Sequence, residues 1–185
     1  MIDSIMEDTR TRMRKSIAAV KAELAKIRTG RATPALLDHV VVNYYGNDVP
    51  LNQAATISVS DARTLSVQAW EKNMVPTIEK AILESQLGLN PVTAGEVVRI
   101  PIPSLTEERR REMTKLVRTE GENGKVAIRN VRRDAIGHAR DLVKNKDIGQ
   151  DDEKRGVEQI QSLTDQHTAE IDSLIREKEV EIMEV

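Results

Sequence analysis

Three arginines stand within five positions in the segment RNVRRDA, at Arg129, Arg132 and Arg133. The planar guanidinium group of arginine binds phosphate oxygens in pairs, so this spacing suits the binding of a polyanion. The same residues could instead be ordinary solvated charge, because a charged outer face is the norm for amphipathic helices. The distribution of charged and apolar residues around the segment distinguishes a phosphate-binding site from an ordinary solvated face.

A helical projection of residues 106–145 gathers the basic side chains on one face, within about 60° of Arg129 at about 100° per residue. This basic stripe consists of Arg111, Lys115, Arg118, Lys125, Arg129, Arg132, Arg133, Arg140 and Lys144. The apolar side chains opposite it are Met113, Val117, Val131, Ala135 and Leu142. The segment therefore predicts a long helix with one apolar and one basic face.

The stripe holds few acidic residues, which favours a partner over simple solvation. Solvated faces usually mix signs, and Arg129 and Arg133 form a like-charged pair at i,i+4 that opposes the helix. Glu122 is the main acidic exception, and Ile136 interrupts the stripe. RNA or DNA is the favoured ligand. Because the helix has no aromatic side chain for base stacking, we expect phosphate and shape contacts with a structured nucleic acid.

No group of residues has the spacing of a catalytic or metal site. His39, His138 and His167 are scattered, and we expect each at the surface or in helix packing. RTGRATP lacks the glycine-lysine-serine/threonine ending of a phosphate-cradling loop, and Asp151-Asp152 reads as a helix start. The chain has no cysteine. The expectation is a protein that is not an enzyme and needs no cofactor or metal.

Charge is balanced overall but unevenly distributed. The net charge is −2, yet residues 105–146 carry 12 basic and 7 acidic side chains, while residues 147–185 carry 4 and 12. The N-terminus MIDSIMEDTR has no apolar run of the kind a signal peptide needs, and no segment resembles a membrane span. We expect a cytosolic protein with no membrane contact.

Apolar spacing predicts helices at both ends and a mixed module between them. Residues 2–27 read as a helix that ends near Gly30, and two further helices follow over about 106–145 and after the KDIGQDD loop. VVVNYYG, AATISVS and TLSVQAW read as strands, PTIEKAILESQ as a short helix, and LGLNP with EVVRIPIP as turns and one or two strands. Pro101 and Pro103 should stop the sheet.

Three helices with one apolar stripe each are expected to bury those stripes together. The predicted fold class is α+β, with residues 1–30 and 105–185 forming a three-helix bundle and residues 31–104 an inserted small β/α/β domain. Two short connections join the parts. They predict a hinge at Gly30, Arg31, Pro101, Pro103 and Ser104.

Several motifs together resemble one family across essentially the whole chain. They are KIRTGRATPALLD, VVNYYG, PLNQAATISVSDARTL, IEKAILESQLGLNP, VRIPIPSLTEERRREM and RNVRRDA, in this order. In order and spacing they are similar to the bacterial ribosome recycling factors. This resemblance is specific, because several long motifs match at once.

The resemblance implies an L-shaped, tRNA-like outline and a monomer that binds the post-termination ribosome. With elongation factor G and GTP, such factors split the ribosome into subunits and free mRNA and tRNA. It also implies that arginines contact the rRNA of the large subunit. That role carries over to Arg28, Arg31, Arg129, Arg132 and Arg133, and the basic stripe adds Lys125 and Arg140 as candidates.

Two alternatives and one departure accompany this interpretation. A helical scaffold that self-associates through its stripes is the second hypothesis, and an enzyme is a distant third. A scaffold would bind with little salt dependence, whereas an rRNA binder would lose affinity steeply with salt. Gly121, Gly124 and Gly137 depart from good helix sequence, each costing about 1 kcal/mol against alanine in an exposed helix. They predict reduced stiffness in the second bundle helix.

Overall fold

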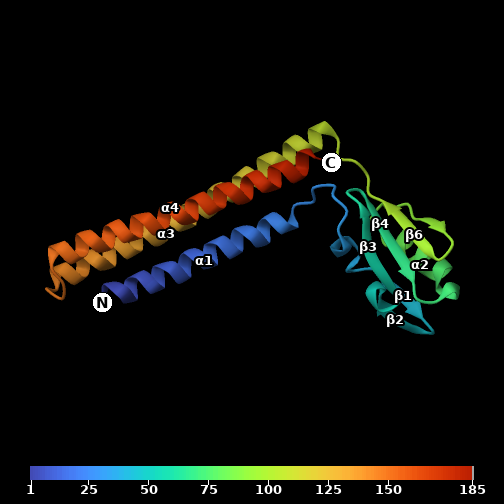
Figure 1. Ribbon diagram of the computed structural model, residues 1–185, viewed down its shortest axis with the longest axis horizontal. Coiled ribbons are helices and arrows are strands. Elements are labelled where there is room, and N and C mark those ends of the chain that lie inside the picture. The colour runs from blue at the N-terminus through green and yellow to red at the C-terminus, as the bar shows by residue number, and fades with distance from the viewer. Residues whose placement is uncertain (185) are drawn as a thin grey trace. The chain divides into compact units, whose positions relative to one another are not determined.

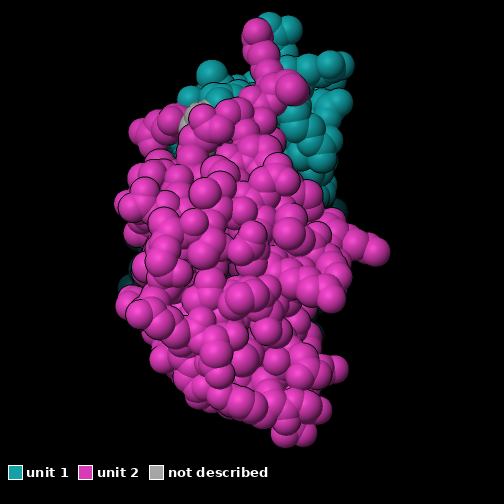
Figure 2. Space-filling view, turned by 90° about the vertical axis from the view of Figure 1, so that its right-hand side faces the viewer, with its two compact units in different colours: residues 1–28, 108–183 teal, residues 29–107, 184–185 magenta. Residues whose placement is uncertain are grey.

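The computed structural model describes residues 1–184 and confirms an α+β fold. The chain forms two compact units (Figures 1 and 2). One comprises Met1–Arg28 and Glu108–Met183, and the other is built on Thr29–Glu107. We call them the helical unit and the inserted unit.

The helical unit consists of α1 (Ile2–Lys26), α3 (Glu107–Lys144) and α4 (Gln150–Met183), and α3 and α4 run nearly the length of the unit (Figure 1). Their apolar stripes meet in one core, as predicted. The core includes Met13, Ile17, Val20, Leu24, Ile27, Met113, Val117, Ile128, Val131, Leu163, Ile171 and Ile182. Burial of these stripes against one another is what stabilises helices of this length.

The turn between α3 and α4 closes with a Schellman-type cap. Lys146 adopts a φ of +63°, its N–H donates to the Val143 carbonyl at 3.0 Å, and the Asp147 N–H donates to the Leu142 carbonyl at 2.9 Å. These bonds satisfy carbonyls that the end of α3 would otherwise leave without donors. Asp151, Asp152 and Glu153 then lie in the first turn of α4, where carboxylates are favourable, so the predicted helix start is confirmed.

The glycines of α3 do not interrupt it, and two of them have a packing role. Gly121 and Gly124 are both buried. A Cβ at Gly121 would lie 2.0 Å from Ile175 Cδ1 of α4, and one at Gly124 would lie 2.3 Å from Val20 Cγ2 of α1. The expectation that these positions are exposed was wrong, because each glycine lets a neighbouring helix approach. At Gly137 nothing lies within 4 Å of an added Cβ, so only there does the exposed-helix argument apply.

The inserted unit contains a hairpin, a four-stranded antiparallel sheet and one helix. The hairpin pairs β1 (Val41–Tyr44) with β2 (Asn47–Pro50), and the larger sheet has the order β3-β4-β6-β5. Its strands are β3 (Ala55–Asp61), β4 (Thr64–Ala69), β5 (Val92–Ala94) and β6 (Val97–Pro101), and the helix is α2 (Val75–Glu84). Short 3-10 turns occupy Pro34–Leu37, Leu51–Gln53 and Lys72–Met74.

A second apolar core holds the inserted unit together. Leu65 and Val67 of β4 are fully buried and pair in register with Ile100 and Val98 of β6. Ile78 and Ile82 of α2 belong to the same core. The sheet ends at Pro101, as predicted: this proline is the last residue of β6 and pairs with Thr64. A proline fits a strand end, where its missing N–H costs no ladder bond.

Candidate nucleic-acid interface

The RNVRRDA segment lies near the middle of α3, with its apolar and basic residues on different sides. Val131 and Ala135 are buried in the helical unit, while Arg129 and Arg133 are exposed and Arg132 is half-buried. Met113 and Val117 are buried further along the same apolar side. The predicted division of α3 into an apolar and a basic face is therefore confirmed.

Several cations of the basic stripe are already paired with carboxylates. Arg118 Nε lies 2.6 Å from Glu179 of α4, and Lys125 Nζ lies 2.5 Å from Asp172 of α4. Arg140 Nε lies 3.8 Å from Glu153 of α4. Arg129 pairs with Glu122 within α3. The charge of these four side chains is thus partly offset inside the protein.

Arg132 and Arg133 differ from their neighbours on the stripe. Neither makes an ion pair with a carboxylate anywhere in residues 1–184. The Nε of Arg132 is buried and has no hydrogen-bond partner within that range. A phosphate oxygen is a strong acceptor for the outer nitrogens of a guanidinium group, and within residues 1–184 no carboxylate competes for either side chain. The adjacent pair Arg132 and Arg133 is therefore the point of the stripe best able to take an anionic ligand.

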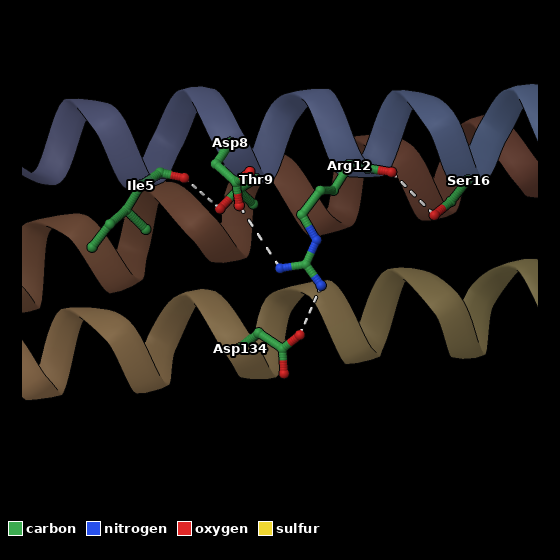
Figure 3. A network of polar contacts seen from close by, with 6 residues as sticks. All are labelled: Ile5, Asp8, Thr9, Arg12, Ser16 and Asp134. Carbon is green, nitrogen blue, oxygen red and sulfur yellow. Dashed lines mark hydrogen bonds and ion pairs between the residues drawn. The ribbon is translucent and has the colours of Figure 1, made fainter.

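Asp134, in the same segment, has a structural role that the sequence did not reveal. Arg12 of α1 donates from Nη2 to Asp134 Oδ2 at 2.7 Å and also lies 3.8 Å from Asp8 (Figure 3). The hydrogen bond from Arg12 lowers the pKa of Asp134, and the same contact raises the pKa of Arg12. This pair joins α1 to α3 beside the two free arginines.

Arg28 lies apart from this point within the helical unit. Arg28 and Arg31 are both exposed, and Arg31 belongs to the inserted unit. Arg28 lines a shallow hollow with Met113 and Glu120. At 1.5 Å per helical residue, that part of α3 is about 18–28 Å from Arg132. A single ligand would have to span that distance to touch both ends.

The residues expected at the hinge lie close to backbone that is fixed in the inserted unit. The Ala32 N–H donates to the Ala62 carbonyl at 2.8 Å, and the Ile102 N–H donates to the Arg63 carbonyl at 2.7 Å. The Arg63 guanidinium also donates to the Ser104 hydroxyl. Gly30, by contrast, adopts a φ of +77°, a conformation that favours glycine.

The inserted unit carries a polar aromatic cluster that the sequence did not predict. The Tyr44 and Tyr45 hydroxyls both donate to the Glu71 carboxylate, with the Tyr44 bond at 2.5 Å. These bonds lower the pKa of Glu71, and the same contact raises the pKa of Tyr44. Trp70 is 61% exposed, and its indole N–H donates to the Thr56 hydroxyl at 2.9 Å. The turn between β1 and β2 thus brings Tyr44 and Tyr45 to Glu71, which follows them by 27 and 26 positions.

The histidines lie where the sequence suggested. His39 and His138 are exposed, while His167 is buried in α4 with Nδ1 at 2.8 Å from the Leu163 carbonyl. Within residues 1–184 no three His, Asp or Glu side chains are grouped closely enough to hold a metal ion. Over the same range, none of the helices combines the length and apolar character needed to cross a membrane.

Comparison with known proteins gives concordant matches. Residues 20–183 match the family model described as ribosome recycling factor. A ribosome-recycling factor of Thioalkalivibrio sulfidiphilus (strain HL-EbGR7) is 58% identical over all of both chains, and one of Legionella pneumophila (strain Paris) is 55% identical over the same extent. Among these relatives the likeness extends from one end of the chain to the other.

Two solved structures share the fold. A solution structure of the ribosome recycling factor superposes with a TM-score of 0.72 at 42% identity, covering 100% of this chain and 98% of the other. A structure described as models for the T. thermophilus ribosome recycling factor and the E. coli elongation factor G bound to the E. coli post-termination complex gives a TM-score of 0.64 at 46% identity, covering 99% of each chain.

Proposed function

This chain belongs to the ribosome recycling factor family, and on that premise we propose that it binds the post-termination ribosome and, with elongation factor G and GTP, splits it into subunits. The splitting would release mRNA and tRNA for new initiation in the cytoplasm. Support for the partners comes from the related structure, which is described as bound to a post-termination complex together with elongation factor G.

The observation that carries the proposal is that the adjacent residues Arg132 and Arg133 of the long helix α3 make no ion pair within residues 1–184. Phosphate contacts position a protein on RNA without reading its sequence, and arginine is well suited to them. The large-subunit rRNA is the ligand we assign to this pair. Lys125, Arg129 and Arg140 would add contacts by exchanging their carboxylate partners for phosphate, and Arg28 and Arg31 would contact RNA elsewhere.

The two units would have different roles in ribosome splitting. The helical unit holds rRNA, while the inserted unit receives force from elongation factor G through a hinge. Ala32 and Ile102 are buried in the core of the inserted unit and bonded to its backbone, so bending would concentrate in residues 29–31 and 103–107. Pro101 then acts as the stiff edge of the hinge, and Gly30 and Ser104 lie in its flexible parts.

The energy for splitting would come from the partner GTPase. A ligand shifts an equilibrium only by its differential affinity for two states, so a monomeric chain without cofactor can bias subunit separation by binding one ribosome state better. GTP hydrolysis on elongation factor G would then make the cycle directional.

A splitting assay tests this function. Vacant or post-termination ribosomes are mixed with the chain, elongation factor G and GTP, and subunit separation is followed by light scattering. The expected result is a fall in scattering only when all three additions are present. Splitting that is unchanged when the chain is omitted, or GTP hydrolysis by the chain alone, would contradict the proposal.

A further inference from the structure

Two of the ion pairs between α3 and α4 follow a regular step, while the longer contact of Arg140 with Glu153 lies outside it. Arg118 pairs with Glu179 and, seven residues further along α3, Lys125 pairs with Asp172, seven residues earlier in α4. Seven residues are close to two helical turns, so the same sides of two antiparallel helices meet again at each step. We call these two contacts the α3–α4 ladder.

The ladder stops immediately before the free arginines. A third step would pair Arg132 with Asp165, but the Asp165 carboxylate instead accepts a hydrogen bond from Gln161 Nε2 at 2.8 Å. Arg132 makes no ion pair within residues 1–184. One stripe of cations is therefore neutralised at two successive positions and left open at the third.

The ladder contributes little to holding the helices together. Arg118 and Asp172 are 69% and 46% exposed, and their partners Glu179 and Lys125 are each 24% exposed. Ion pairs with one member open to solvent in this way stabilise proteins only slightly. Close packing of Gly121 and Gly124 against Ile175 and Val20 already fixes α3 in place. Stabilisation of the fold therefore does not explain why Asp172 and Glu179 lie opposite Lys125 and Arg118.

Competition between these carboxylates and a polyanion for the same cations explains their placement. A polyanion gains affinity from each cation that it can neutralise, because each such contact releases counterions. A cation already 2.5–2.6 Å from a carboxylate offers less, since its partner must be displaced and repels the incoming phosphate. Without the two ladder carboxylates, Arg118 and Lys125 would offer two further phosphate contacts to any RNA.

We propose that Asp172 and Glu179 are specificity-determining residues: they mask Lys125 and Arg118, so that RNA of arbitrary shape finds these two cations already paired, whereas rRNA that is positioned by Arg132 and Arg133 can displace Asp172 from Lys125. The masked half of the stripe then gives little affinity for RNA of arbitrary shape. The proposal rests on the proposed function for the identity of the cognate RNA, but the masking itself does not depend on it.

A pair of charge-matched variants tests the masking. Asp172→Asn/Glu179→Gln removes the ladder carboxylates, whereas Glu158→Gln/Glu177→Gln makes the same charge change at exposed positions of α4 that pair with no cation within residues 1–184. Binding of each full chain to fluorescent poly(U) is measured by anisotropy across a salt series. Circular dichroism checks that each variant is folded. If the ladder double variant unfolds, the single variants Asp172→Asn and Glu179→Gln are measured in its place.

The ladder variant should bind poly(U) roughly tenfold more tightly at low salt, with a log–log salt slope steeper by about 1.4 for two added single-strand phosphate contacts. The control variant Glu158→Gln/Glu177→Gln should show a clearly smaller increase in affinity for poly(U). Equal gains in the two variants would attribute the effect to net charge and overturn the proposal, as would no gain in either. Binding of the wild type to large subunits is recorded separately, so failure of the proposed function would appear there and not in the poly(U) comparison.

Discussion

Two halves of the same helix are built for different tasks. In residues 118–125 of α3, buried glycines bring Val20 and Ile175 close, and the cations Arg118 and Lys125 are paired with α4. In residues 129–140, Arg132 and Arg133 have no ion pair within residues 1–184, and Gly137 faces open space. The first half is closed against its neighbours, and the second is available to a ligand.

This difference shows that a basic stripe on a helix is not uniform in what it can bind. Residue type and periodicity place nine cations on one face. Which of them are free depends on the carboxylates that the neighbouring helices bring within reach. An electrostatic interface is therefore defined by the whole bundle and not by one helix.

The largest expected effect is at Gly124. Gly124→Val forces side-chain atoms into Val20, whose Cγ2 already lies 2.3 Å from the ideal Cβ position. Overpacking of this kind typically costs about 1–3 kcal/mol. Far-ultraviolet circular dichroism reports the helices, whereas fluorescence of Trp70, the one tryptophan, reports the inserted unit. The urea midpoint should fall by dichroism and change little by fluorescence. An unchanged dichroism midpoint would contradict the close packing.

Gly137→Ala is the matched change in the open half of α3 and should have the opposite sign. An added Cβ meets nothing within 4 Å, so alanine should stabilise the helix by about 1 kcal/mol. The measurement is again urea unfolding followed by far-ultraviolet circular dichroism and by Trp70 fluorescence. A loss of stability would mean that Gly137 is packed like Gly121, and the contrast between the two halves would disappear.

A smaller effect is expected from the Arg12–Asp134 pair, and it depends on pH. Because the folded-state pKa of Asp134 lies below the ordinary value of 3.8, the pair stabilises the fold above that value and loses its contribution as pH falls through the lowered pKa. Asp134→Asn should lower the melting temperature at neutral pH and match the wild type in acid. A difference that persists unchanged at pH 2 would assign the effect to packing.

Periodicity was enough to predict the helical unit and most of the inserted unit. The apolar stripe of α1 and the division of α3 into two faces depend on local spacing, which the sequence displays directly. Strand β2 was missed because Asn47, Asp48 and Pro50 carry no alternating apolar pattern. Its hairpin depends on the turn at Tyr45 and Gly46, whose φ values are +49° and +87°. Tyrosine rarely occupies such a position, so the turn had no sequence signature.

The errors have a common physical cause, which is tertiary context. Gly121 looks like a weak point in a helix until Ile175 is placed against it. Arg118 and Arg132 look alike in a helical projection, yet one meets Glu179 and the other does not meet Asp165. Asp134 looked like part of a binding motif and instead bonds Arg12. None of these partners is local in sequence.

The central claim is that Arg132 and Arg133, which make no ion pair within residues 1–184, contribute more to rRNA binding than the paired cations of the stripe. The direct test is binding to isolated large subunits across a salt series, comparing the wild type with Arg132→Ala and Arg118→Ala. Loss of a charged hydrogen-bonding contact worth about 1.5–3 kcal/mol predicts roughly ten- to hundredfold weaker binding for Arg132→Ala, with a shallower salt slope by about one contact. Arg118→Ala should change affinity little. Equal losses in the two variants, or no loss in Arg132→Ala, would contradict the account.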